Sequence, residues 1–251
     1  MDGSPQEKAS SVKAGAGRRP QRRAMLRRAV RWAQAALLAG VVLTLGWVCL
    51  YAVMDPPGTP LMLIRRMQGV PTQGWTPVPL DRIAPALQRA VIGAEDSRFC
   101  SHHGVDWEAV DAAMDEDEEG HKLRGASTIS QQTAKNAFLW PGRTWLRKGV
   151  EFGFTELIEL IWGKRRILEM YLNIVEWGDG LYGAEAASRA YFGVPASALS
   201  PAQAAALAAV LPSPRKWNAR HPGPYVARRI GILEQRATIV ARDGLDGCLR
   251  R

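Results

Sequence analysis

The sequence predicts a mainly α-helical domain preceded by a single membrane-spanning helix. The uncharged apolar run WAQAALLAGVVLTLGWVCLYAVM occupies residues 32–54, and about 20 apolar residues are enough to cross a bilayer as a helix. Beyond this run, apolar residues recur mostly at the spacing of an amphipathic helix. Alternating β-branched runs, which would indicate strands, are scarce. These observations favour a helical body of residues 55–251 attached to an anchor.

Residues 1–31 form a basic tail that we expect to be disordered and cytoplasmic. The formal net charge of the chain is +9, and this segment carries nine Lys and Arg against two acidic residues. The folded body is therefore nearly neutral, whereas a nucleic-acid-binding domain would carry a basic face, so nucleic acid is not expected as a partner. Basic clusters beside a span bind anionic lipid headgroups and stay on the cytoplasmic side.

The apolar run at 32–54 is interpreted as an uncleaved anchor. A buried core helix and a cleaved signal peptide are the alternatives. The apolar region of a signal peptide is usually only about 7–15 residues long, which is shorter than this run. Trp32, Trp47 and Tyr51 lie toward the ends of the run, where interfacial aromatic residues are found. With the basic tail inside, the rest of the chain is expected outside the cytoplasm.

The three cysteines do not describe a disulfide framework. Cys49 lies in the apolar run, which leaves Cys100 and Cys248 in the body. These two could pair in an oxidising compartment, but we start from the expectation that they stay unpaired. Neither a CxxC nor an HExxH pattern is present, so no dedicated zinc site is expected.

Helix starts in the body are marked by residues that are typical N-caps. Ser200 and Gln203 form a capping box, with Pro201 at the first helical position. The segment 61–79 lacks a clear period and is expected to hold only short extended pieces. The expected N-caps and helix starts are Asp81, Asp106, Ser127, Trp145, Lys164 and Ser200.

Glu95 is the first candidate catalytic residue, in the segment GAEDSRFCSHHGVD. An apolar helix containing Val91 and Ile92 precedes it, and a loop follows it. A carboxylate at such a boundary can be partly desolvated, and desolvation raises its pKa toward that of a working base. The alternative is an ordinary surface acid, which is the commoner environment for glutamate.

Glu151 is the second candidate, in the segment RTWLRKGVEFGFTELIEL. Arg147 and Lys148 precede it by four and three residues, so all three share one face of a helix. A surface ion pair worth less than about 1 kcal/mol is the alternative. The functional interpretation is an acid held among cations that can also bind phosphate. Two carboxylates in different environments are what sugar-transfer chemistry requires.

A polar segment, RGASTISQQTAKN, lies between the two acids. Gln132, Lys135 and Asn136 are spaced to project donors from a helix that Ser127 could cap. Hydroxyl, amide and ammonium donors beside a helix start suit an anion such as pyrophosphate. An N-capped surface helix without a ligand is the alternative. No GxxxxGK loop is present, so nucleotide hydrolysis is not indicated.

Five blocks of the chain, in order, resemble the peptidoglycan glycosyltransferase domain of penicillin-binding proteins and of stand-alone transglycosylases. The blocks are EDSRFCSHHGVD, GASTISQQTAKN, RKGVEFGFTELIE, KRRILEMYLNIVEWGDGLYGAEAASRAYFG and LSPAQAAALAAVLPSPRKWNARHP. The resemblance covers residues from about 57 to 242. Departures are small: Ala126 replaces the second Gly of the usual GGST, and Thr133 replaces a common Leu. With no transpeptidase module following, the monofunctional form is expected.

The resemblance implies a lysozyme-like large lobe, a small membrane-proximal jaw lobe and lipid II as substrate. By motif, Glu95 is expected to be the general base that deprotonates the 4-hydroxyl of the acceptor lipid II. The resulting oxygen attacks the anomeric carbon of the growing lipid-linked chain with inversion, and undecaprenyl pyrophosphate leaves. Glu151 is expected to support that departure, either directly or through a divalent cation (Mg²⁺ or Mn²⁺) shared with the pyrophosphate.

Other residues take expected roles from the same motifs. The substrate-binding residues are expected to be Ser127, Gln132, Lys135, Asn136, Arg143, Arg147 and Lys148. Residues expected to build the loop around the base are Asp96, Phe99, His102 and Gly104. Residues of the fourth block, among them Tyr171 and Asn173, are expected to be mainly structural. No tightly bound cofactor is expected.

The resemblance also implies a setting and leaves two rival functions. The protein is expected in the cell inner membrane with its catalytic domain in the periplasm, alongside other cell-wall synthases or division proteins. A lysozyme-like lytic muramidase would use two carboxylates on a similar scaffold, but it has no pyrophosphate to hold with the cations around Glu151. A non-catalytic cell-wall scaffold has no need of Glu95 and Glu151.

Overall fold

The computed structural model describes residues 18–118, 127–142 and 144–250, and it is mainly α-helical, as predicted. The α-helices are α1 Arg18–Val53, α2 Pro60–Met67, α3 Pro85–Glu95, α4 Trp107–Glu118, α5 Ile129–Phe138, α6 Trp145–Ile161, α7 Gly163–Ile174, α8 Ala184–Phe192, α9 Pro201–Val210 and α10 Pro224–Arg242. Short 3₁₀ turns are η1 Leu80–Arg82, η2 Ala196–Ala198 and η3 Gly247–Leu249, and the strands are β1 Glu176–Gly178 and β2 Leu181–Tyr182.

Helix α1 contains the apolar run and is long and apolar enough to cross a membrane over Met25–Val53. It begins at Arg18, so the helix reaches back into the basic segment that we expected to be disordered. The segment before the span, residues 18–31, contains seven Arg, which is a good helix former, and the helix can extend through them. Residues 1–17 of the predicted tail lie outside the described residues. Contacts divide the chain into two units, Met1–Trp47 and Val48–Arg251.

Several predicted helix starts are confirmed in the second unit. Asp106 caps α4 by accepting a hydrogen bond from the Ala109 N–H at 3.1 Å. Ser200 and Gln203 form the predicted capping box at the start of α9. Helix α6 begins at Trp145, and helix α7 covers the segment predicted after residue 164. These signals are local, which is why the sequence alone could carry them.

Three local predictions were wrong. Asp81 lies in η1 instead of capping a helix, because α3 begins at Pro85, a residue suited to the first helical position. Thr128 caps α5 in place of Ser127 and forms a capping box with Gln131. The segment after Pro60 forms helix α2, not an extended piece, because Thr59 and Pro60 supply the N-cap and the first position.

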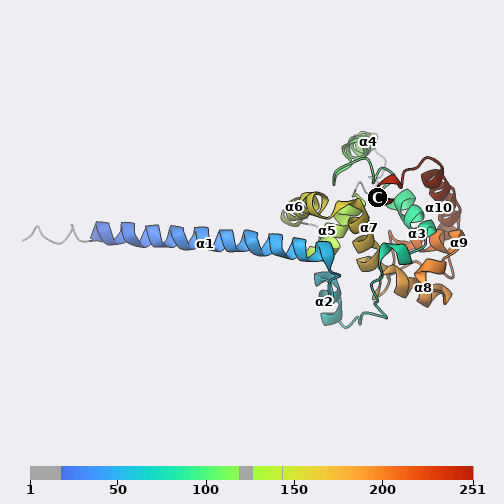
Figure 1. Cartoon of the computed structure of the whole chain (residues 1–251), viewed down its shortest axis with the longest axis horizontal. Helices are drawn as coiled ribbons and strands as arrows, with labels where there is room; N and C mark the ends of the chain where they lie inside the picture. Colours follow the sequence, from blue (N-terminus) through green and yellow to red (C-terminus); the bar gives the residue numbers. More distant parts are fainter. Residues whose placement is uncertain (1–17, 119–126, 143, 251) are drawn as a thin grey trace, which may run out of the picture. The chain divides into compact units, whose positions relative to one another are not determined.

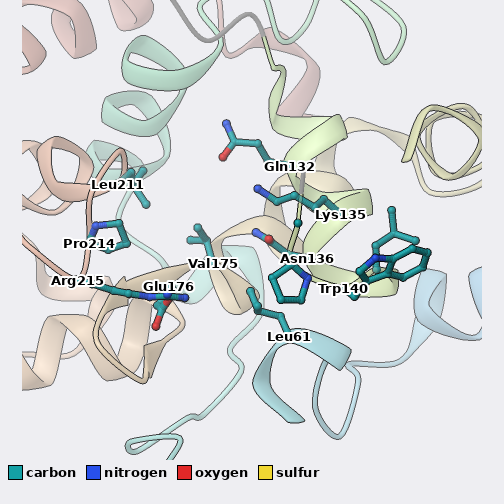
Figure 2. Close-up of a pocket in the computed structure, with 13 residues that line it drawn as sticks. Leu61, Gln132, Lys135, Asn136, Trp140, Val175, Glu176, Leu211, Pro214 and Arg215 are labelled. Carbon is teal, nitrogen blue, oxygen red and sulfur yellow. The ribbon is translucent and has the colours of Figure 1, made fainter. Parts of the chain in front are cut away.

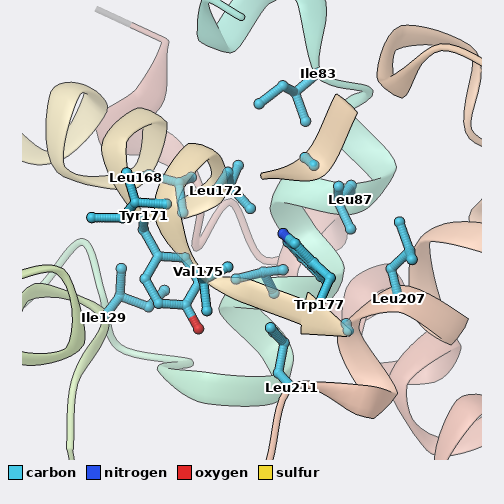
Figure 3. Close-up of a cluster of buried hydrophobic side chains, with 14 of the residues drawn as sticks. Ile83, Leu87, Ile129, Leu168, Tyr171, Leu172, Val175, Trp177, Leu207 and Leu211 are labelled. Atoms are coloured by element: carbon cyan, nitrogen blue, oxygen red, sulfur yellow. The ribbon is translucent and has the colours of Figure 1, made fainter. Parts of the chain in front are cut away.

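The second unit is a helical body with one small hairpin. Helix α3 packs against α9 and α10, and α5 packs against α6 and α7 (Figure 1). Strands β1 and β2 pair antiparallel, with Glu176 opposite Tyr182. Figure 3 shows the buried apolar cluster at the centre of this body, where Trp177 lies close to Leu87 and Leu207. This core fixes the ends of α3 and α5, and both of these ends carry candidate site residues.

Cys100 and Cys248 form a disulfide bond, so the expectation that they stay unpaired was wrong. Their Cα atoms lie 5.5 Å apart although 148 residues separate them in sequence. The packing of α10 against α3 brings the chain end near η3 to the loop that follows α3. Only tertiary structure creates this proximity, and no spacing rule could show it. The bond ties the loop after Glu95 to the C-terminal segment.

Breaking this disulfide should lower the stability of the folded body. Loss of a cross-link that closes a long loop costs about 2–5 kcal/mol. Thermal unfolding of the full chain in detergent, followed by circular dichroism, should therefore show a lower Tm for Cys248→Ser. The matched control is Cys49→Ser, because Cys49 is an exposed free cysteine of α1. An unchanged Tm for Cys248→Ser would contradict the assigned bond.

Candidate active site

The buried carboxylate of Asp96 joins the end of helix α3 to the start of helix α5. It accepts a hydrogen bond from the Ile129 N–H at 3.0 Å and contacts His102 Nε2 at 3.0 Å. The free N–H groups at a helix start carry partial positive charge, so an acid is favoured there. Because Asp96 follows Glu95 directly, this join places Glu95 beside the first turns of α5.

The loop after Asp96 is held by the other residues predicted to support the base. Thr128 donates its hydroxyl hydrogen to the Gly104 carbonyl at 2.5 Å. Gly104 has a φ of +82°, and a Cβ there would lie 2.9 Å from Thr155 Cγ2, so glycine is required. Phe99 is fully buried and makes an edge contact with the His102 ring. The structure thus brings the four predicted supporting residues together around one turn.

Glu95 is half-buried at the last position of α3. Burial raises the pKa of its carboxyl because the charged form is desolvated. A hydrogen bond from Gln132 Nε2 to Glu95 Oε2, 2.9 Å long, lowers the pKa in part. The positive charges of Arg229 and Lys135 also lower the pKa of Glu95, yet the effect of burial is larger and the pKa stays above its ordinary value. A carboxylate with a raised pKa is suited to accept a proton near neutral pH.

Glu151 has a different environment, with two cations and only 3% exposure. Arg147 Nη1 donates to Glu151 Oε2 and Lys148 Nζ donates to Oε1, each at 2.5 Å. The Nε atom of Arg147 is buried and has no hydrogen-bond partner within the described part of the chain. The predicted sharing of one helix face by these three residues is therefore observed. Both oxygens of Glu151 are already occupied by cations.

Lys135 lies on α5 within the electrostatic reach of both acids. Burial lowers the pKa of its ammonium group, and Glu151 opposes this shift. Glu95 raises the pKa as well, whereas Arg147 and Lys148 lower it. Among the described residues, the Lys135 ammonium makes no hydrogen bond or ion pair that would occupy it. A half-buried cation without a protein partner is available to an anionic ligand.

A cavity of about 320 Å³ opens beside α5. Figure 2 shows Gln132, Lys135 and Asn136 projecting from α5 toward the opposite wall, which contains Leu211 and Arg215. The lining residues are Leu61, Gln132, Lys135, Asn136, Leu139, Trp140, Pro141, Gly142, Val175, Glu176, Leu211, Pro214 and Arg215. The cavity therefore combines amide and cationic donors with apolar walls.

A second cavity, of about 190 Å³, borders Glu95 itself. Its wall also includes Ser127, one of the predicted binding residues, and Arg236 from α10. Glu95 lines this cavity and Gln132 lines the larger one, and the two side chains are hydrogen-bonded to each other. The Glu95–Gln132 pair therefore lies between two cavities, as a proton acceptor between two sugar substrates would.

Sequence reasoning missed three residues around Glu95. Arg229 and Arg236 come from α10, and no local motif connects them to the acid. Tyr171 was expected to be mainly structural, but its hydroxyl donates to Gln132 Oε1 at 3.3 Å. Tyr171 lies in the fourth of the five family blocks, so the sequence marked this residue but gave no indication that Gln132 is its partner. Arg143 and Ala126 lie outside the described residues.

Comparison with known proteins identifies the family. A family model described as Transglycosylase matches residues 63–240. The chain belongs to the transglycosylase family. It is 58% identical to the biosynthetic peptidoglycan transglycosylase of Rhodospirillum centenum, with 86% of this chain and 94% of that relative covered. The corresponding protein of Caulobacter vibrioides is 53% identical over 85% of this chain and 91% of its own length.

The family match includes every candidate site residue of this transglycosylase. Glu95, Glu151 and the donors of α5 all lie within residues 63–240. A third relative, from Pseudomonas entomophila, is also named biosynthetic peptidoglycan transglycosylase and is 52% identical over 84% of this chain and 88% of its own length. Both carboxylates and the donors of α5 thus belong to the part of the chain that matches the family model.

The two cations beside Glu151 should differ in their contribution to stability. Arg147 is buried with Glu151, and breaking a buried ion pair costs about 3–5 kcal/mol. The Lys148 side chain is 42% exposed, so its pair is worth less than about 1 kcal/mol. Urea unfolding should therefore show a much lower free energy of unfolding for Arg147→Met than for Lys148→Met. Equal losses for the two variants would contradict this interpretation of the cluster.

Proposed function

We propose that this transglycosylase polymerises lipid II, a disaccharide-pentapeptide carried on undecaprenyl pyrophosphate, into peptidoglycan glycan strands. The observation that carries the proposal is the position of Glu95: a half-buried carboxylate with a raised pKa lines one cavity and is hydrogen-bonded to Gln132, which lines the other. Family membership and the names of the relatives support the reaction class. The proposed lipid-linked substrate follows from the resemblance of the sequence motifs to those of peptidoglycan glycosyltransferases.

Glu95 acts as the general base in this reaction. One of its carboxylate oxygens takes the proton of the acceptor 4-hydroxyl, and the hydroxyl oxygen attacks the anomeric carbon of the growing chain. The bond between that carbon and the pyrophosphate oxygen breaks, and its electron pair leaves with undecaprenyl pyrophosphate. A single displacement of this kind inverts the anomeric configuration. Burial of Glu95 supports the role, because a base with a raised pKa holds the transferred proton more strongly.

Donors around the larger cavity bind the departing pyrophosphate. Lys135 offers an ammonium group that no described residue pairs with, and Asn136 lines the same cavity. Arg147 and Lys148 neutralise phosphate charge near Glu151, which holds both of them in place. Ser127, Gln132 and Arg143 complete the proposed binding set. Charge-assisted hydrogen bonds from Lys and Arg are among the strongest available to phosphate.

A bound divalent cation fits this site poorly. Glu151 was the residue expected to share Mg²⁺ or Mn²⁺ with pyrophosphate, but each of its oxygens already accepts from a cation. Among the described residues, no group of three or more His, Cys, Asp or Glu could hold a metal ion. We therefore assign the neutralisation of pyrophosphate charge to Lys135, Arg147 and Lys148, and no step runs through a metal.

The setting that we propose is the inner membrane, with the body in the periplasm, where other cell-wall synthases or division proteins could join it. Helix α1 is the candidate span. Large apolar side chains are also exposed on the body, among them Met67 of α2 and Trp145 and Leu160 of α6, which are 79%, 92% and 82% exposed. Exposed apolar groups of this size suit contact with lipid. A lipid-linked substrate requires a site close to the bilayer.

The rival functions are less consistent with the site. A lytic muramidase needs a second carboxylic acid that can donate a proton to the leaving sugar. Both oxygens of Glu151 accept hydrogen bonds from Arg147 and Lys148, so neither is placed to donate a proton to a leaving sugar. A non-catalytic scaffold gives no reason for a half-buried ammonium at Lys135 that acts electrostatically on two acids and pairs with no described residue.

Replacing the proposed base should abolish polymerisation and leave the fold intact. Labelled lipid II is incubated with the wild type or Glu95→Gln, and the products are separated by size. Polymer is expected from the wild type and none from the variant, because the amide cannot take the proton. The matched control is Glu108→Gln, since Glu108 forms a surface pair with Arg98. Equal polymer from Glu95→Gln, or fragments released from preformed peptidoglycan, would overturn the proposal.

The pH dependence of kcat/KM should report the ionisation of both Glu95 and Lys135. Activity should rise with pH as Glu95 loses its proton, at a pH above its ordinary pKa of 4.5. It should fall again as Lys135 becomes neutral, at a pH below its ordinary pKa of 10.5. Lys135→Arg keeps the charge at high pH, so the alkaline limb should move upward in that variant. An alkaline limb that does not move would exclude Lys135 as its source.

A further inference from the structure

We propose that Tyr171 is a positioning residue for the general base and acts on Glu95 through the side-chain amide of Gln132. The inference rests on the proposed role of Glu95 and deepens it. The three residues come from three helices, α3, α5 and α7, so the arrangement depends on the packing of the whole body. Tyr171 itself is not among the described residues that line the two cavities beside Glu95 and Gln132.

The Gln132 amide uses all of its polar groups in one orientation. Its Nε2 donates to Glu95 Oε2 at 2.9 Å and to the Ser127 carbonyl at 3.4 Å. A carboxylate and a backbone carbonyl can only accept, so the nitrogen must face both of them. The Oε1 atom is left to accept from the Tyr171 hydroxyl, at 3.3 Å. Tyr171 thus supplies the one donor that completes this orientation.

The burial of Tyr171 holds its hydroxyl in place as a hydrogen-bond donor to Gln132. It is fully buried in α7, and its ring lies among Ile129, Leu168 and Val175 (Figure 3). Burial, together with the negative charges of Glu95 and Asp96, raises the pKa of its phenol well above the ordinary value. The hydroxyl therefore keeps its hydrogen throughout the working pH range. A ring packed on all sides also cannot turn away from Gln132.

Removing the Tyr171 hydroxyl leaves Gln132 Oε1 without its donor. A half-buried carbonyl oxygen in this state is better satisfied by water, and the amide can reach water by rotating into the adjoining cavity. That rotation weakens the hydrogen bond from Gln132 to Glu95. Because this hydrogen bond stabilises the charged carboxylate, its loss favours the protonated form. The charges of Arg229, Lys135 and Asp96 around Glu95 stay in place. The pKa of Glu95 should therefore rise further.

The test is a direct titration of the Glu95 carboxyl in the full chain, by NMR of enzyme with ¹³C-labelled glutamate. Glu95→Gln assigns the signal. Tyr171→Phe should raise the pKa of Glu95 by about 0.5–1 unit, the size of shift that one lost hydrogen bond to a carboxylate produces. Tyr191→Phe is the matched control, because its hydroxyl donates to the Trp177 carbonyl instead. An unchanged Glu95 pKa in folded Tyr171→Phe would overturn the inference.

A double-mutant cycle keeps the inference testable if Tyr171→Phe disturbs packing. Gln132→Ala should raise the pKa of Glu95 by itself, and adding Tyr171→Phe should then change nothing, because the connecting amide is gone. No shift in Gln132→Ala, or a further shift in the double variant, would contradict action through Gln132. The titration needs no turnover, so a failure of the wild type to polymerise lipid II refutes the proposed function and leaves the positioning result to be judged separately.

Discussion

The hydrogen bond from the start of helix α5 to the carboxylate of Asp96 is the contact on which the candidate site depends. It fixes the end of α3 against the first turn of α5, with His102 on the same carboxylate. Glu95 and Gln132 come into contact because each lies next to this join in sequence. Helix α7 then contributes Tyr171, whose hydroxyl donates to Gln132, and α10 contributes Arg229, whose positive charge acts on Glu95. Without the join, the hydrogen bond from Gln132, which lines one cavity, to Glu95, which lines the other, would not form.

The two carboxylates, Glu95 and Glu151, have different hydrogen-bond partners and different degrees of burial, and these environments suit them to different roles. Glu95 has one neutral amide donor and partial burial, so its pKa rises and it can take up a proton. Glu151 is more deeply buried and accepts hydrogen bonds from two cationic side chains. Lys135 lies within electrostatic reach of both acids, and among the described residues it has no hydrogen-bond or ion-pair partner. These contrasting environments are the basis for the base and the phosphate-binding cations that we propose.

Features encoded by local spacing could be predicted from the sequence. The cations around Glu151 share its helix face at intervals of three and four, so their contact followed directly from helix geometry. The apolar run, the Asp106 cap and the capping box at Ser200 are equally local. The family motifs predicted the supporting loop around Gly104, although the close approach of Thr155, which leaves no room for a Cβ at Gly104, was visible only in the structure.

Features created by tertiary packing could not be predicted. The disulfide joins Cys100 to Cys248 across 148 residues, and the partner of Tyr171 lies 39 residues away on another helix. Asp81 was misassigned because its capping tendency was judged without the stronger preference of Pro85 for a first helical position. For the disulfide and for Tyr171, the deciding contact is between segments that no single window of sequence contains, whereas the error at Asp81 was one of judging two local signals.

The stereochemistry of the new glycosidic bond tests whether Glu95 activates the acceptor hydroxyl for a single displacement. The anomeric configuration of the product, read from one-bond carbon–hydrogen coupling in ¹³C-labelled polymer, should be inverted relative to the lipid-linked donor. Retention of configuration would require a covalent glycosyl-enzyme intermediate on a second carboxylate and would contradict the account.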